Sequence, residues 1–204
     1  MTGGDEKSGF GCFSQAFGIW YIIFSMRGMG KKIIFMGAVG SGKSTQADLL
    51  TKKLNLPRVN MGEIFRRIAQ DNQEVKEIVL RGELVNDEIT MLLLRQELGD
   101  EKYNNGFVID GVPRNLFQAE NLPFEPDVII YLSVRDSENI KRLTKRGRTD
   151  DTKDVIKNRL VLYHEQTEPV LDFYRGKGKL VEVDGEPPIE VIFKDILQKL
   201  KVLN

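Results

Sequence analysis

The sequence has almost none of the residues that cross-link small secreted domains or bind zinc. Cys12 is its single cysteine and His164 its single histidine. One cysteine cannot form an internal disulfide, and one cysteine with one histidine cannot build a Cys/His zinc site. We therefore expect a chain without disulfides or a zinc site, located in the reducing cytoplasm.

An excess of charge of one sign is also missing. Thirty Lys and Arg residues balance thirty Asp and Glu residues, so the formal net charge is zero. Without an overall basic field, the chain is not expected to bind nucleic acid, and any anion site must be local. Its 204 residues, of which 41% are hydrophobic and 29% charged, suit one globular domain and exclude a long multidomain enzyme.

The chain lacks a hydrophobic run long enough to span a membrane. Residues 10–26 are apolar and aromatic, but they include Gln15 and fall short of the ~20 mostly apolar residues of a transmembrane helix. Asp5 and Glu6 precede them, so the basic start of a secretory signal is missing. We interpret residues 1–28 as an N-terminal extension or a non-native start. A surface or partner-binding helix and a membrane anchor at residues 10–26 are the alternatives.

From Lys32 onward, short apolar runs alternate with amphipathic stretches of helical length, a pattern typical of a parallel sheet covered by helices. The runs at 107–110 and 128–134 are continuously apolar, as expected for strands buried on both faces. Asp87 and Ser137 are expected to cap helices. The expected strands are 33–37, 57–60, 107–110, 128–134 and 180–184, and the expected helices are 42–54, 62–71, 74–81, 87–98, 115–121, 137–146, 152–175 and 189–200.

A glycine-rich segment follows the first expected strand. Residues 37–44, GAVGSGKS, match the phosphate-loop pattern G-x-x-x-x-G-K-S/T between a strand and a helix. Its glycines let backbone N–H groups turn toward a phosphate, while Lys43 reaches the β- and γ-phosphates and Ser44 offers a hydroxyl to Mg²⁺. The segment predicts a nucleoside triphosphate site with these contacts: Gly40, Ser41, Gly42, Lys43, Ser44 and Thr45.

Arginines on the acceptor side narrow the reaction. Phosphoryl transfer needs charge neutralised over both substrates, and planar guanidinium groups grip phosphate oxygens in pairs. Asp110 ends an apolar strand, where its carboxylate can orient magnesium-bound water beside the phosphate loop. A GTPase is disfavoured because no Asn-Lys-x-Asp segment is present. The candidate arginines are Arg66, Arg114, Arg142, Arg146, Arg148 and Arg159.

Five ordered motifs from Lys31 to the C-terminus resemble the nucleoside monophosphate kinases, and most closely the adenylate kinases. They are GAVGSGKSTQ at 37–46, NMGEIFR at 60–66, GELVNDE at 82–88, DGVPRNLFQ at 110–118 and RLTKRGRTDD at 142–151, with Arg159 beyond the last. The expected architecture is an α/β fold, a three-layer α/β/α sandwich on a five-stranded parallel sheet, in a P-loop kinase domain over residues 29–204.

The resemblance implies reversible, Mg²⁺-dependent phosphoryl transfer from ATP to AMP, giving two ADP. It also implies a helical monophosphate-binding insertion at residues 60–86 and a very short lid at 146–152, and we expect a monomer. Arg142 and Pro187 are expected beside ATP, and Ser44 and Asp110 near Mg²⁺, mainly through water. The expected catalytic residues are Lys43, Arg114, Arg146, Arg148 and Arg159. The expected AMP contacts are Met61, Gly62, Arg66, Glu83, Leu84, Val85, Gly111, Arg114 and Gln118.

Departures from the family pattern leave the acceptor base open. Met61 stands where the resemblance leads one to expect a threonine that bonds adenine, and Val112 replaces an aromatic residue. Met61 and Asn115 also fit a UMP or CMP kinase, whereas Gln118 favours the adenylate pattern. A nucleotide-binding module without turnover is the third interpretation. It predicts lost arginines or a broken phosphate loop, and the sequence shows neither.

Overall fold

The computed structural model describes residues 31–148 and 151–202. The expected extension at residues 1–28, with its apolar stretch 10–26, lies outside these residues, as do residues 149–150 of the expected lid. Within the described ranges, no helix has the length and apolar character needed to cross a membrane.

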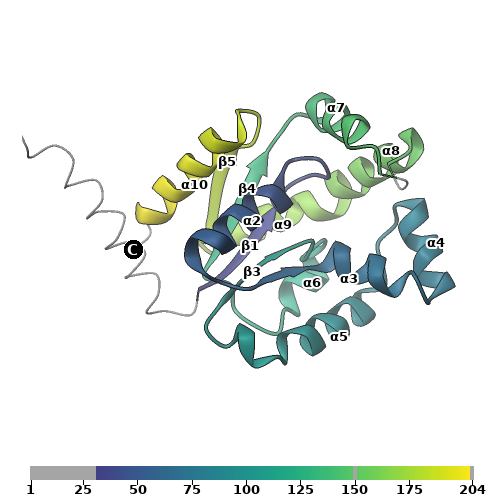
Figure 1. The fold of residues 1–204 in the computed structure, drawn as a ribbon, viewed down its shortest axis with the longest axis horizontal. Helices are drawn as coiled ribbons and strands as arrows, with labels where there is room; N and C mark the ends of the chain where they lie inside the picture. The colour runs from purple at the N-terminus through teal and green to yellow at the C-terminus, as the bar shows by residue number, and fades with distance from the viewer. Residues whose placement is uncertain (1–30, 149–150, 203–204) are drawn as a thin grey trace, which may run out of the picture.

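Five parallel strands form one sheet in the order β2-β3-β1-β4-β5 (Figure 1). The strands are β1 (Lys32–Met36), β2 (Arg58–Asn60), β3 (Phe107–Asp110), β4 (Val128–Ser133) and β5 (Leu180–Asp184). At the centre, Ile34 of β1 lies in register with Ile109 of β3 and Ile129 of β4. The five-stranded parallel sheet expected from the sequence is confirmed.

Side chains of the central strand alternate between two apolar clusters. Ile33 and Phe35 belong to the cluster that includes residues of α2 (Lys43–Leu54) and α10 (Ile189–Val202). Ile34 and Met36 belong to the opposite cluster, with residues of α5 (Asp87–Leu98), α6 (Leu116–Glu120) and α9 (Glu168–Gly176). Because both faces of the sheet are covered, the strands carry continuous apolar runs. The expected three-layer sandwich is therefore confirmed.

The other helical segments lie between these strands and helices along the chain. They are α3 (Met61–Ile68), α4 (Gln73–Arg81), η1 (Glu101–Tyr103), α7 (Asp136–Arg146), α8 (Lys153–Leu162) and η2 (Tyr163–Thr167). The expected helix at 152–175 is continuous from α8 to α9, and its middle turn, η2, is π-helical.

Two expected helix caps are wrong. The side chain of Asn86, not Asp87, accepts hydrogen bonds from the N–H groups of Glu88 and Ile89 at the start of α5. Asp87 instead occupies the first helical position, where a negative charge favours the helix dipole. α7 begins at Asp136, one residue before Ser137, and its cap position makes no side-chain hydrogen bond.

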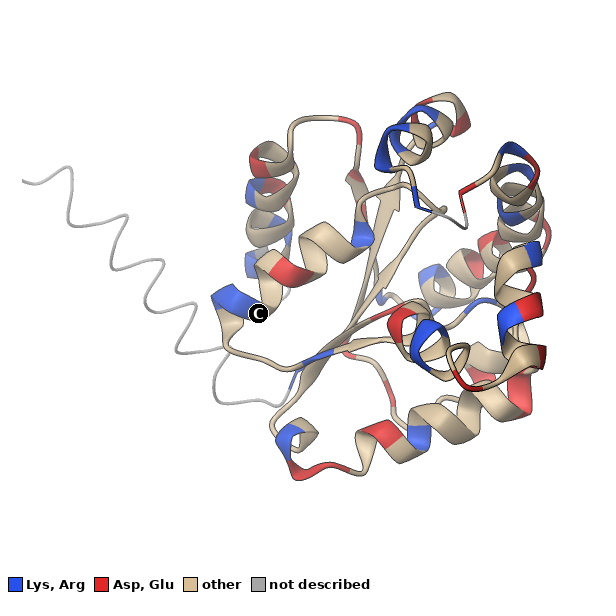
Figure 2. Ribbon diagram, turned by 45° about the vertical axis from the view of Figure 1, so that its right-hand side comes forward, with Lys and Arg blue, Asp and Glu red and all other residues tan. Residues whose placement is uncertain are grey.

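The carboxyl edge of the sheet places the candidate motifs together. β1, β3 and β4 end at the same edge of the sheet. The chain places β2 and β3 on one side of β1 and β4 and β5 on the other, and ligands of open α/β sheets bind where the strand order changes direction in this way. The phosphate loop follows β1, and Asp110 is the last residue of β3. Figure 1 shows α7 and α8 above this edge and α3 and α4 beside it, and Figure 2 places Lys and Arg at the start of α2 and the end of α7 around it.

Candidate active site

The loop between β1 and α2 has a backbone that requires glycine. Gly37, Gly40 and Gly42 have φ values of 144°, 89° and 92°. A Cβ at Gly37 would lie 2.7 Å from the Leu132 carbonyl oxygen, and one at Gly40 would lie 2.8 Å from the Asn139 carbonyl oxygen. L-side chains are strained at these φ values, and at Gly37 and Gly40 the close backbone also leaves no space for them. The sequence pattern thus forms a tight loop that ends at the N-terminus of α2.

Lys43 begins α2 and turns back over this loop. Its Nζ donates hydrogen bonds to the carbonyl oxygens of Gly37 (2.8 Å) and Ala38 (2.7 Å). Burial, with the nearby Arg114 and Arg146, lowers the pKa of Lys43 to about 7, and Asp110 acts in the opposite direction. Because α2 has no side-chain N-cap, its first N–H groups also remain available. The loop therefore offers positive charge and backbone donors to an anion.

The carboxylate of Asp110 lies across from the loop and is almost fully buried, at 2% exposure. Its Oδ2 accepts a hydrogen bond of 2.7 Å from Ser44 Oγ. Its Oδ1 is buried and finds no hydrogen-bond partner among the described residues. Buried polar atoms rarely stay unpaired, and a carboxylate beside a hydroxyl is a donor set that Mg²⁺ prefers. Ser44 and Asp110 therefore fit a magnesium ion.

Residues 31–148 and 151–202 contain no group of three or more Cys, His, Asp or Glu side chains able to hold a metal. Mg²⁺ usually keeps several waters and uses one or two carboxylates together with substrate phosphates. A site with one carboxylate and one hydroxyl is consistent with that chemistry.

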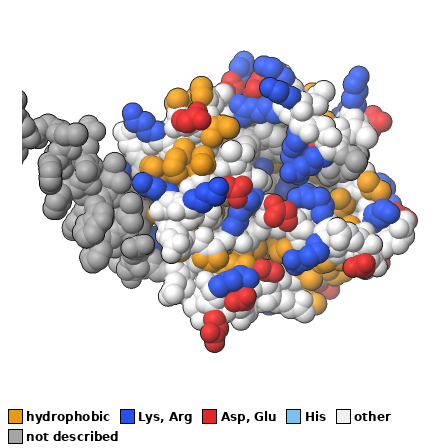
Figure 3. Space-filling view, in the orientation of Figure 1, with side chains coloured by type: hydrophobic (Ala, Val, Ile, Leu, Met, Phe, Trp, Pro, Cys, Tyr) orange, Lys and Arg blue, Asp and Glu red, His pale blue; other side chains and the backbone are white. Residues whose placement is uncertain are grey.

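The loop opens into a cavity of about 770 Å³ at the carboxyl edge of the sheet. Figure 3 shows Lys and Arg side chains gathering on this face between α8 and α3. Ligand cavities commonly have volumes of ~300–1,000 Å³. The expected site residues that line it are Gly40, Ser41, Gly42, Lys43, Ser44, Thr45, Gly62, Arg66, Glu83, Leu84, Val85, Asp110, Gly111, Arg114, Gln118, Arg142, Arg146, Arg148, Arg159 and Pro187.

Met61 is the expected site residue that the structure does not bring to the cavity. Its side chain is fully buried and packs in the apolar cluster beneath α5 and α9. The reason is local, because α3 starts at Met61 directly after β2, with the Asn60 side chain as its N-cap. The first side chain of the helix thus continues into the core. The Met61 side chain therefore does not line the cavity.

A buried carboxylate gathers two of the expected catalytic arginines. Arg146 donates to both oxygens of Asp151, from Nε and Nη2, each at 2.7 Å. Arg159 donates to Asp151 Oδ1 at 3.3 Å and to the Val79 carbonyl oxygen at 3.3 Å. The Asp151 side chain is fully buried, so it holds both guanidinium groups at the rim of the cavity. Asp151 was not singled out from the sequence.

We expect Asp151→Asn to destabilise the fold, because the variant leaves two guanidinium groups without their carboxylate. Removing one partner of a buried ion pair is costly, but Arg146 and Arg159 are 33% and 19% exposed. The expected loss in unfolding free energy is therefore about 1–3 kcal/mol. Urea denaturation measures it. The control is Asp172→Asn, which removes an 81% exposed partner of Arg175 and should change stability little. Equal stability of the two variants would show that Asp151 does not hold the arginines.

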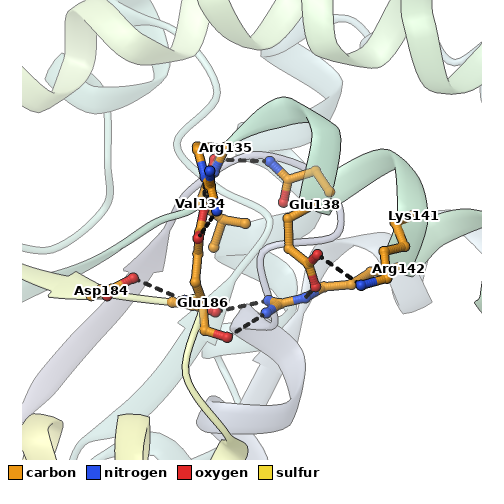
Figure 4. A network of polar contacts seen from close by, with 9 residues as sticks. Val134, Arg135, Glu138, Lys141, Arg142, Asp184 and Glu186 are labelled. Atoms are coloured by element: carbon orange, nitrogen blue, oxygen red, sulfur yellow. Dashed lines mark hydrogen bonds and ion pairs between the residues drawn. The ribbon is translucent and has the colours of Figure 1, made fainter.

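The wall that carries Pro187 is tied to α7 by a polar network (Figure 4). Arg142 donates to the carbonyl oxygens of Gly185 at 2.8 Å and Glu186 at 3.1 Å. Arg135 donates from Nε and Nη2 to the Glu186 carboxylate at 2.7 and 2.6 Å. These hydrogen bonds from Arg135 lower the pKa of Glu186 to about 2. The network fixes the loop of Pro187 beside Arg142, so both expected ATP contacts line one wall.

The opposite wall holds Arg114 and Gln118. Arg114 Nε donates to the Gly111 carbonyl oxygen at 2.9 Å, and burial lowers the Arg114 pKa, with Asp110 opposing and Arg159 adding to the shift. Gln118 Oε1 accepts from the Arg114 backbone N–H at 2.7 Å, and its Nε2 donates to Asp87 Oδ1 at 2.6 Å. One amide hydrogen and one oxygen lone pair of Gln118 remain for a ligand.

Some cavity residues were not expected from the sequence. Phe65 and Thr90 both line the cavity, although Phe65 lies inside the motif 60–66 and Thr90 lies two residues beyond the motif 82–88. Asp87 holds the amides of Gln118 and Asn115, whereas its acidic position suggested only a cap. Its place inside the motif 82–88 was the signal that could have identified it.

Comparison with known proteins gives the family. A family model described as adenylate kinase matches residues 35–179. The adenylate kinase of Thermobifida fusca is 38% identical over 185 residues, which cover 83% of this chain and 98% of that protein. Adenylate kinase 1 of Synechocystis sp. is 37% identical over 184 residues, covering 85% and 98%. The adenylate kinase of Leptospira biflexa is 37% identical over 185 residues, covering 83% and 100%. The chain belongs to the adenylate kinase family.

Proposed function

We propose that the protein catalyses the reversible, Mg²⁺-dependent transfer of a phosphoryl group from ATP to AMP, giving two ADP. The observation that carries this proposal is the convergence of a phosphate loop and several basic side chains on one cavity, among them Lys43, Arg114 and Arg159. Such a site neutralises charge over both substrates, which is the main requirement of phosphoryl transfer. Family membership supports the adenine nucleotides as the substrates.

The donor side is the phosphate loop and the N-terminus of α2. Backbone N–H groups and Lys43 hold the β- and γ-phosphates, and Arg142 and Pro187 lie at the wall beside them. Ser44 and Asp110 would hold Mg²⁺, mainly through water. The bound ion would neutralise part of the negative charge of the phosphates. The proposed ATP contacts are Gly40, Ser41, Gly42, Lys43, Ser44, Thr45, Arg142 and Pro187.

The acceptor side is the wall around Arg114. Arg66 and Arg114 grip the AMP phosphate, while Gln118 and the backbone at 83–85 face the adenine. An oxygen of the AMP phosphate forms a new bond to the γ-phosphorus of ATP. The bond between this phosphorus and the β,γ-bridging oxygen breaks, and that oxygen leaves as part of ADP. No general base is needed, because this phosphate is already anionic at neutral pH. The proposed AMP contacts are Gly62, Arg66, Glu83, Leu84, Val85, Gly111, Arg114 and Gln118.

His164 takes no part in this scheme. Its two ring nitrogens lie 2.9 Å from Glu168 and 2.9 Å from Asp136, and it is absent from the lining of the cavity. We assign it to the packing of η2 against the start of α7.

Two segments are proposed to close over the nucleotides, the insertion at residues 60–86 and the short lid at 146–152. α4 and α8 are already in contact, since Asn158 Nδ2 donates to the Arg81 carbonyl oxygen at 2.9 Å. Arg146, Arg148 and Arg159 then face the transferred phosphoryl group. Closure excludes water and prevents hydrolysis of ATP, and reopening releases the products. We infer a cytoplasmic monomer that acts on nucleotides, without nucleic-acid partners.

The acceptor base is tested with ATP, Mg²⁺ and a panel of AMP, CMP, UMP and GMP in a coupled assay. We expect AMP to exceed the other acceptors in kcat/KM by about 100-fold or more, because a hydrogen-bonding site rejects bases that leave its polar groups unpaired. Removing Mg²⁺ with EDTA should abolish the transfer. A preference for CMP or UMP would make the protein a pyrimidine monophosphate kinase. Absence of transfer to any acceptor would indicate a binding module without turnover.

A further inference from the structure

Arg58 holds the candidate magnesium ligand from outside the cavity. It is the first residue of β2, and its Nη2 lies 3.1 Å from Asp110 Oδ2. Its Nη1 pairs with the carboxylate of Asp48 on α2. Arg58 is not among the residues that line the cavity, so it can act on a nucleotide only through another residue. Neither Arg58 nor Asp48 belongs to a motif found in the sequence.

Three contacts link four side chains into a ring that the backbone of α2 closes. Ser44 and Asp48 are separated by four residues on α2 and therefore share one face of the helix. Ser44 Oγ donates to Asp110, Asp110 pairs with Arg58, and Arg58 pairs with Asp48. The strand register supports the ring, because Asn60 lies opposite Asp110 and Arg58 lies two residues earlier on the same face.

The ring leaves one oxygen of the carboxylate for a cation. Asp110 Oδ2 is shared by Ser44 and Arg58, and Oδ1 has no donor among the described residues. A cation bound at Asp110 therefore shares one buried carboxylate with a guanidinium group. Like charges repel strongly where water is scarce, so Arg58 must weaken the affinity for that cation. Asp48 offsets part of the Arg58 charge and acts in the opposite direction.

We propose that Arg58 is a positioning residue of the magnesium site, an inference that rests on the proposed function. It fixes the Asp110 carboxylate with Oδ1 available and limits the affinity for Mg²⁺, so that the ion can leave with each product nucleotide. Asp48 sets how much of the Arg58 charge reaches Asp110. The ring thus determines both the orientation of the ligand and the strength of metal binding.

The test measures Mn²⁺ affinity by electron paramagnetic resonance, with the protein saturated by the β,γ-imido analogue of ATP, which cannot transfer its terminal phosphoryl group. Arg58→Met should tighten Mn²⁺ binding by about tenfold, because the repelling charge is gone. Asp48→Asn should weaken it by about threefold, because Arg58 then acts on Asp110 without an offset. Two opposite shifts distinguish this role from a purely structural one.

Kinetics and matched variants complete the test. In Arg58→Met, kcat should fall because the more tightly held ion leaves more slowly with the product. KM for AMP should stay unchanged because Arg58 touches neither nucleotide. Arg58→Lys keeps the charge and should return the Mn²⁺ affinity toward that of the wild type. Arg175→Met removes an exposed arginine that also has two carboxylate partners, and should leave both quantities unchanged.

Unchanged Mn²⁺ affinity in Arg58→Met and Asp48→Asn, or shifts of the same sign, would overturn the proposal. If Arg58→Met does not fold, Asp48→Asn carries the test, because the Asp48 side chain is 52% exposed and its loss is tolerable. The proposed function fails separately, through an acceptor other than AMP or no transfer by the wild type. The two opposite Mn²⁺ shifts are measured without phosphoryl transfer, so that result does not change them.

Discussion

Lys43→Met should lower kcat by about 1,000-fold, because one preorganised cation at the transferred group contributes roughly this much. Methionine keeps the apolar part of the side chain and removes the ammonium group, with its charge and its hydrogen-bond donors. The Nζ of Lys43 bonds only oxygen atoms of its own loop, so its loss should leave the rest of the fold intact. Steady-state phosphoryl transfer measures the loss, and a thermal melt provides the control. Activity near that of the wild type would remove Lys43 from the catalytic site.

A second readout for Lys43 is the pH dependence of ATP binding. Burial lowers the pKa of Lys43 to about 7, so in the free protein at pH 8 most of this side chain is neutral. The bound phosphates favour the charged form and raise this pKa, so binding takes up a proton. The affinity for ATP should therefore be level below pH 7 and fall above it, by up to about tenfold per pH unit.

Calorimetry at pH 8 in buffers of different ionisation enthalpy measures that proton uptake. The uptake should be present in the wild type and absent in Lys43→Met. Uptake that persists in the variant would come from another group and would contradict the role of Lys43.

The sheet and its helices were predictable because burial on both faces leaves a direct mark on the sequence. Strands such as 107–110 are apolar up to their last residue, and the helices between them follow a different period. The phosphate loop was predictable for a related reason. Its backbone needs glycine at fixed positions, so Gly37, Gly40 and Gly42 must appear at a fixed spacing.

The residues that hold the site in place were not predictable. Arg58 and Asp110 are separated by 52 residues, and no periodicity links a strand start to the end of its neighbour. Asp151 lies beside expected lid arginines, but its charge alone could not show that it is fully buried between two of them. Met61 was misplaced because its motif suggested a ligand contact, whereas the abrupt start of α3 turns its side chain into the core.

Arg114→Met should lower kcat/KM for AMP by about 1,000-fold and leave the affinity for ATP nearly unchanged. The guanidinium lines the acceptor wall and is held by the Gly111 carbonyl oxygen at 2.9 Å, so it is preorganised to grip a phosphate. Removing a cation that stabilises the transition state of phosphoryl transfer costs about 10³–10⁵-fold. Kinetics with varied AMP, together with binding of ATP alone, separate the two effects.

The matched control is Arg67→Met on α3, whose side chain is 71% exposed and pairs weakly with Glu97 at 3.9 Å. It should keep normal kcat/KM for AMP. If Arg114→Met also kept it, the acceptor site would lie elsewhere.

Arg114 also reports on the donor side, because after burial it is the largest cause of the low pKa of Lys43. In Arg114→Met that repulsion is gone, so the pKa of Lys43 should rise and less of Lys43 should be neutral at pH 8. Proton uptake on ATP binding at pH 8 should therefore shrink relative to the wild type. A general loss of structure would weaken ATP binding itself, whereas this variant should bind ATP and differ only in the proton. That result would show that Lys43 and Arg114 face one another across the space in which the phosphoryl group moves.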